Sequence, residues 1–148
     1  MARDLFNAVK VARAIYPQAV GTSGASNGVT SPVIDRLGYQ SVLFDIAYGT
    51  SGATGDTITP VVFECSTSDG SFTSAADADL IGTEALAALP AQATSRTSGT
   101  GKNVSKKVGY KGIKRYVKLK LYGIGTATGL VAANALLGDP VHAPAATG

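Results

Sequence analysis

The chain has 148 residues, enough for one domain that builds its own core without a metal or a disulfide. It is 45% hydrophobic and 16% charged with 18 glycines, and its single cysteine, Cys65, excludes an internal disulfide. The net charge of +3 argues against a dedicated nucleic-acid binder, and no apolar run reaches the roughly 18 residues that a membrane span needs.

The first 20 residues lack the uninterrupted apolar stretch of a secretory signal, and we expect them to form an extended arm or an edge strand. Tyr16 precedes Pro17, which disfavours a helix because a residue before proline is pushed to extended geometry. A loop rich in Gly, Ser and Thr follows at 21–31.

The clearest strand covers residues 39–48, where apolar side chains alternate with a second set and so indicate one buried face. Residues 57–67 form a second strand, in which Pro60 suggests an edge position or a bulge. The Asp69-Gly70 turn leads to a short strand at 71–73.

Residues 77–90 are the one plausible helix, and a polar segment occupies 91–102. The strand at 113–122 places Ile113, Arg115, Val117, Leu119 and Leu121 on one face and a Lys/Tyr set on the other. A last apolar strand spans 127–137.

Short strands separated by glycine-rich turns predict an all-β fold, an antiparallel β-sandwich or a small jelly-roll-like barrel with at most one short helix. We expect a single domain over 1–148, with the arm or edge strand at 1–20, a β-core at 33–137 and an extended tail at 138–148.

Catalytic and metal-binding patterns are absent from the sequence. His142, the single histidine, lies in a Pro/Ala-rich tail where a general base would be hard to hold, and Cys65 ends an apolar strand. Asp77, Asp79 and Glu84 suit a helix N-terminus better than a calcium loop. We therefore expect no enzyme, no cofactor and no metal site.

Basic residues gather in one stretch: eight of the thirteen lie between Lys102 and Lys120, and no acidic residue occurs from Ala85 to Gly138. Three readings remain open: a solvated outer face, a docking face for an acidic protein, and a nucleic-acid face that uses lysines for phosphates and rings for bases. The candidate docking residues are Lys114, Tyr116, Lys118, Lys120 and Tyr122 on the strand, Arg3, Lys10 and Arg13 in the arm, and Pro140 and His142 in the tail.

Five segments carry a resemblance to a known family: 4–11 (DLFNAVKV), 34–42 (IDRLGYQSV), 66–73 (STSDGSFT), 109–117 (GYKGIKRYV) and the closing LGDP at 137–140 with HAP at 142–144. In this order they resemble small capsid-associated proteins of tailed bacteriophages and gene transfer agents. The resemblance implies a decoration (cement) or other head-associated role without catalysis. It also suggests Arg115 as a structural cation buried beside the sheet.

This resemblance implies the major capsid protein as partner and a place on the capsid exterior of a virion made in the host bacterial cytoplasm. Shell proteins in general suggest a homo-oligomer, with a trimer expected, although no residue here specifies it. Two alternatives remain: a head–tail connector or tail-tube component, and a carbohydrate- or nucleic-acid-binding β-module.

Overall fold

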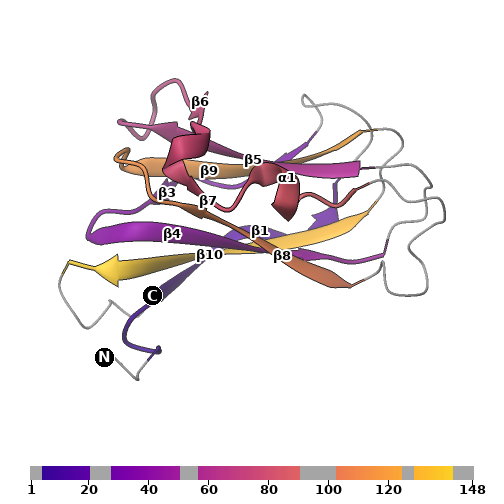
Figure 1. Ribbon diagram of the computed structural model, residues 1–148, viewed down its shortest axis with the longest axis horizontal. Helices are drawn as coiled ribbons and strands as arrows, with labels where there is room; N and C mark the ends of the chain where they lie inside the picture. The colour runs from indigo at the N-terminus through magenta and orange to yellow at the C-terminus, as the bar shows by residue number, and fades with distance from the viewer. Residues whose placement is uncertain (1–4, 21–27, 51–56, 91–102, 125–128, 142–148) are drawn as a thin grey trace.

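The chain folds into two antiparallel sheets packed face to face, a β-sandwich (Figure 1). The computed structural model describes residues 5–20, 28–50, 57–90, 103–124 and 129–141. Within these ranges the two sheets remain separate, so the sandwich prediction is confirmed and the barrel alternative is not observed.

Sheet A has five strands in the order β1 (Lys10–Ala19), β10 (Leu130–Pro140), β4 (Tyr39–Tyr48), β8 (Val104–Tyr110) and β7 (Leu80–Ile81). Sheet B has the order β2 (Val29–Thr30), β9 (Tyr116–Ile124), β5 (Thr57–Cys65) and β6 (Thr73–Ser74), and β3 (Ile34–Asp35) also pairs with β9. A 3-10 helix, η2 (Asp77–Asp79), connects β6 of sheet B to β7 of sheet A, and one helical turn, α1 (Glu84–Ala87), follows β7.

The core forms where period-two patterns from both sheets meet. β4 buries Val42, Phe44, Ile46 and Tyr48, as the alternation predicts, and β9 contributes the buried Val117, Leu119 and Leu121. Because successive strand residues point to opposite faces, the remaining β4 and β9 side chains form the outer faces of the sandwich.

The free side of β5 explains how Pro60 is accommodated. The Ile58 N–H on this side bonds the Leu89 carbonyl at 2.9 Å, and the Val62 N–H bonds Glu84 Oε1 at 2.8 Å. Pro60 lies between them and has no N–H to donate, so no ladder bond is lost there. β5 is an inner strand of sheet B, but β6 pairs only with Phe63 and Glu64, so Pro60 occupies a locally unpaired side of the strand.

Three local expectations differ from the structure. The helix expected at 77–90 is reduced to η2 and α1, separated by the short β7, because Leu80 pairs with Tyr110 at the sheet edge. β8 was not predicted. The strand expected from 113 begins at Tyr116 instead, and Ile113 is 91% exposed in the preceding loop.

Segments near both ends of the chain form strands of the sandwich. The segment expected as an arm or edge strand forms β1, which is the outermost strand of sheet A and contributes Ala14 and Ile15 to the core. β10 continues to Pro140, three residues past the expected end of the core at 137. None of the helices in the described ranges has the length and apolar character to cross a bilayer.

Candidate functional site

The predicted Lys/Tyr set forms one row on the outer face of sheet B. Tyr116, Lys118, Lys120 and Tyr122 alternate along β9 with the buried core residues, and each is half-buried. We call these four residues the Lys/Tyr row. Because β9 is flanked by β5 and by β2 and β3, the row runs along the middle of its sheet.

Neighbouring side chains hold this row in place. The Lys118 ammonium lies 3.9 Å from the centroid of the Phe72 ring, and the Arg115 guanidinium lies 4.9 Å from that of Tyr116. These cation–π contacts restrict two long side chains and leave the positive charge at the surface. In the register, Lys118 faces Phe63 and Lys120 faces Val61 on β5, so the β5 side of both lysines is apolar, whereas Thr30 faces Lys120 from β2.

Arg115 was expected to be a buried structural cation, and that expectation is wrong. Its guanidinium binds Asp35 through two hydrogen bonds, Nε to Oδ1 at 2.8 Å and Nη2 to Oδ2 at 2.7 Å. Both side chains are more than two-fifths exposed, because Arg115 precedes β9 and points outward there. The bond from Arg115 holds the pKa of the Asp35 carboxyl below its usual value.

The other predicted docking residues do not join the Lys/Tyr row. Lys114 lies in the loop before β9, Lys10 and Arg13 lie on β1 in the opposite sheet, and Pro140 pairs with Tyr39 at the end of β10. Arg3 and His142 lie outside the described residues. The predicted set is therefore divided between the two layers.

A buried polar cluster connects the sheets at the end of the sandwich where the 111–115 loop lies. The Tyr110 hydroxyl, on β8, donates to Glu64 Oε2 on β5 at 2.5 Å and accepts the Lys114 N–H at 3.1 Å. Gly112 passes so close that a Cβ there would lie 2.5 Å from this hydroxyl. The Arg36 guanidinium stacks 5.1 Å from the centroid of the Tyr110 ring.

This cluster is structural in character. Burial, reinforced by the Glu64 carboxylate, raises the pKa of Tyr110, so the phenol stays protonated and keeps donating. Arg36 Nη1 is buried without a hydrogen-bond partner among the described residues. This cluster was not predicted from the sequence because its members come from four segments of the chain. The one local signal was Gly112, two residues after Tyr110, where only a glycine leaves room for the hydroxyl.

The remaining reactive groups are scattered. Cys65 is half-buried, and the backbone N–H of Thr67 lowers the pKa of its thiol. The Cys65 sulfur lies 3.8 Å from Thr67 Oγ1, within hydrogen-bonding distance. Within the described ranges, no three His, Cys, Asp or Glu side chains lie close enough to hold a metal ion.

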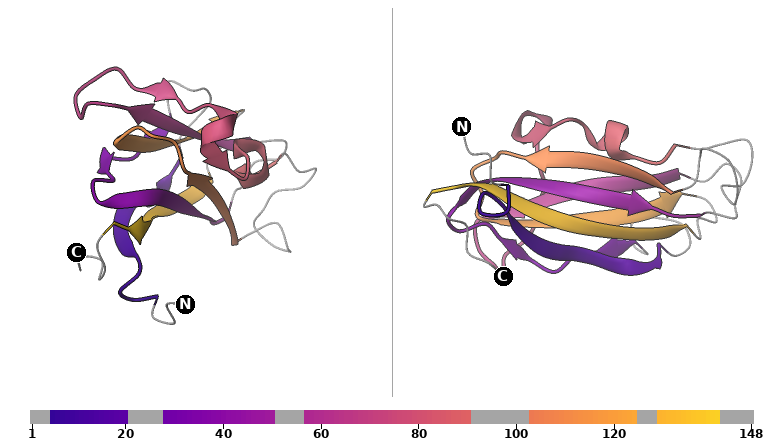
Figure 2. Two further views of the ribbon diagram at one scale, coloured as in Figure 1. Left: turned by 60° about the vertical axis from the view of Figure 1, so that its left-hand side comes forward. Right: turned by 90° about the horizontal axis from the view of Figure 1, so that it is seen from below.

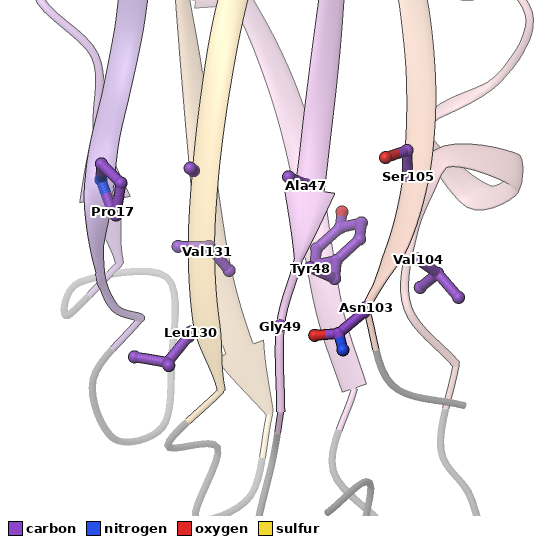
Figure 3. Close-up of a pocket in the computed structure, with 10 residues that line it drawn as sticks. Pro17, Ala47, Tyr48, Gly49, Asn103, Val104, Ser105, Leu130 and Val131 are labelled. Atoms are coloured by element: carbon purple, nitrogen blue, oxygen red, sulfur yellow. The ribbon is translucent and has the colours of Figure 1, made fainter. Parts of the chain in front are cut away.

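A shallow hollow of about 290 Å³ lies on sheet A near the end opposite the Tyr110 cluster (Figure 3). Ala132, Ala47 and Ser105 stand side by side on β10, β4 and β8, so three small side chains form its floor. The other lining residues are Pro17, Tyr48, Gly49, Asn103, Val104, Leu130 and Val131. No charged side chain lines this hollow, which leaves it without a group for acid–base chemistry.

No protein-family model matches the chain, and no curated protein sequence matches it. Among solved structures, the VP2 subviral particle of infectious bursal disease virus is similar, with a TM-score of 0.49 and 14% identity over 90% of this chain and 33% of that chain. The CBM22-1–GH10 modules of Clostridium thermocellum xylanase 10B, complexed with xylohexaose, give a TM-score of 0.46 and 11% identity over 96% of this chain and 28% of that chain. This chain thus spans a third or less of each structure. At these identities the likeness extends to the backbone fold at most.

Proposed function

We propose that this chain is a non-enzymatic virion protein that decorates an assembled phage capsid, with the Lys/Tyr row of sheet B as its docking face. The observation that carries the proposal is the chemistry of that row. Lys118 and Lys120 lie among Tyr116, Tyr122, Phe63 and Val61. Asp35, which faces Tyr116 in the register, is bound to Arg115.

Such a face suits a protein partner with apolar and acidic groups. Aromatic rings supply contact area at low entropic cost, and cations held at the edge of apolar surface select carboxylates on the partner. The sequence resemblance to capsid-associated proteins supports the major capsid protein as that partner and the capsid exterior as the location.

The test is co-sedimentation with capsids that have been stripped of this protein. A Lys118→Asp/Lys120→Asp variant should bind roughly 10- to 100-fold more weakly, because like charges then face the partner's carboxylates. The control is Arg13→Asp, which reverses an exposed charge on β1 in the other sheet. Equal losses in both variants would refute docking through the Lys/Tyr row.

Two further measurements separate the alternatives. Hundreds of bound copies per particle indicate decoration, whereas a ring-sized number indicates a head–tail connector. The same lysines and tyrosines also favour nucleic acid as a second candidate ligand. Binding to naked DNA that weakens steeply with salt and is lost in the Lys118→Asp/Lys120→Asp variant would favour that candidate.

A further inference from the structure

The outer face of sheet A has an apolar row. No strand or helix of the described ranges lies over this face, and the segment 5–9 before β1 lies beneath one end of it (Figure 2, right). By register the row consists of Val11 on β1, Leu136 on β10, Leu43 on β4 and Ile81 on β7. On β8 the row passes through Gly109, where a Cβ would lie 3.1 Å from that of Ile81, so the Ile81 side chain fills the gap. Val11 is 61% exposed and Ile81 56%.

A charged row lies next to it. Arg13, Asn134, Asp45 and Lys107 stand in register on β1, β10, β4 and β8, and all four are exposed. Asp45 is the one carboxylate in this row. Asp45 and Lys107 are direct cross-strand neighbours, yet Asp45 makes no ion pair among the described residues.

A continuous apolar row is not typical of a free surface. Monomeric soluble proteins rarely expose large contiguous apolar patches, and such patches rimmed by polar residues mark association sites. Face-to-face packing of sheets is also the arrangement that this chain already uses inside its own sandwich.

We propose that two copies of this chain pack the outer faces of their A sheets together about a two-fold axis that runs along the strands, between β4 and β8. Rotation about this axis reverses the lateral order of the strands and keeps each row at its own level. Leu136 then meets Ile81 of the partner subunit, and Leu43 meets Gly109 of the partner subunit.

Among two-fold axes that run along the strands, charge complementarity favours this one. It places Asp45 opposite the partner's Lys107 and Lys107 opposite the partner's Asp45, giving two ion pairs. An axis on β4 would set Asp45 against its own copy, and an axis between β10 and β4 would set Arg13 against the partner's Lys107. Like charges in such positions oppose association.

An axis on β10 would instead pair Asp45 with the partner's Arg13, and the shape of β1 argues against it. The register of β1 shifts twice, between Arg13 and Ile15 and between Ile15 and Gln18. Such irregularities bend a strand away from a flat face. β10, β4 and β8 keep a continuous register and form the flatter surface. The contact is two-fold and so differs from the trimer expected from shells in general.

Complementary charge variants test the proposal. The wild type should sediment as two chains, and Asp45→Lys and Lys107→Asp should each sediment as one, with the dimer dissociation constant raised at least about 100-fold by two like-charge contacts. An equimolar mixture of the two variants should form a heterodimer, because the side chains introduced by Asp45→Lys and Lys107→Asp face each other with opposite charges, and the unchanged Lys107 and Asp45 do the same. A cross-strand effect within one chain cannot produce this rescue.

Arg13→Asp is the matched control, because it reverses an exposed cation of the same row outside the overlap and should leave the dimer intact. A wild type that stays a single chain across micromolar concentrations would overturn the proposal, as would a mixture that fails to associate. Loss of the dimer in Arg13→Asp would overturn this axis.

A second variant tests the apolar contact. Ile81→Ser removes an exposed apolar side chain and should weaken the dimer about tenfold, and far-UV circular dichroism checks that each variant keeps its fold. The inference does not depend on capsid binding, which is tested through sheet B.

Discussion

Removing one oxygen from Tyr110 should destabilise the sandwich more than any other phenol-to-phenyl change in its core. Tyr110 is fully buried and its hydroxyl serves two partners, the Glu64 carboxylate and the Lys114 N–H. A hydrogen bond to a charged group contributes about 1.5–3 kcal/mol and a neutral one about 0.5–1.5 kcal/mol. Glu64 is half-buried, and water can replace part of the lost bond. We therefore expect Tyr110→Phe to cost about 2–3 kcal/mol.

Tyr48→Phe is the matched control. Tyr48 is equally buried, but its hydroxyl makes one neutral bond, to the Ala87 carbonyl at 2.8 Å. Its loss should cost about 1 kcal/mol. Urea unfolding followed by circular dichroism measures both free energies, and the slope of the free energy against urea should stay constant. A Tyr110→Phe cost equal to or below that of Tyr48→Phe would show that the Tyr110 cluster does not tie the two sheets together.

Two predictions concern pH. Burial raises the pKa of Glu84 in the fold, the Val62 N–H offsetting part of the effect, so its contribution to stability is present at low pH and is lost as pH rises through the folded pKa. Glu84→Gln keeps the acceptor for Val62, and its unfolding free energy should be equal to or above that of the wild type at pH 7 but not at pH 3. Asp35 has a lowered pKa, so the stability it gains from Arg115 is present above its ordinary pKa of 3.8 and is lost as pH falls through the folded value. Asp35→Asn should cost at most about 1 kcal/mol at pH 7, less in high salt, with no cost in acid. Thermal unfolding across pH checks both variants, and a cost for Asp35→Asn that persists in acid would contradict the ion-pair explanation.

Local alternation predicts a strand correctly when no tertiary contact changes the conformation of the segment. β4 alternates from Val42 to Tyr48, so its buried face follows from sequence alone. The strand at 113–122 shows the limit of this signal. Ile113 and Arg115 continue the alternation, but the Lys114 N–H bonds the Tyr110 hydroxyl and holds the segment in a loop. That constraint comes from tertiary structure and leaves no periodic trace.

β8 escapes prediction because two adjacent lysines interrupt its pattern. Lys107 points outward, whereas Lys106 occupies an inward position at the edge of the sandwich and reaches the Leu86 carbonyl at 3.3 Å. Because β8 was not predicted, Asp45 could be placed on an outer face from the sequence, but Lys107 could not be identified as its neighbour. The candidate interface on sheet A depends on strand order, which separates residues 45 and 107 by 62 positions in sequence while pairing them directly in space.

The two proposed surfaces together make a prediction that neither makes alone. Sheet A and sheet B are opposite layers of one sandwich, so a dimer formed through sheet A turns its two Lys/Tyr rows away from each other. One capsid subunit can then engage one row of each dimer, while the second row faces solution. At saturation, capsids should therefore hold twice as many copies of the wild type as of the monomeric Lys107→Asp variant, whose Lys/Tyr row is unchanged. Quantitative gel densitometry of sedimented particles measures this ratio. A ratio of one would mean that the dimer dissociates on the shell or that docking uses a surface other than sheet B.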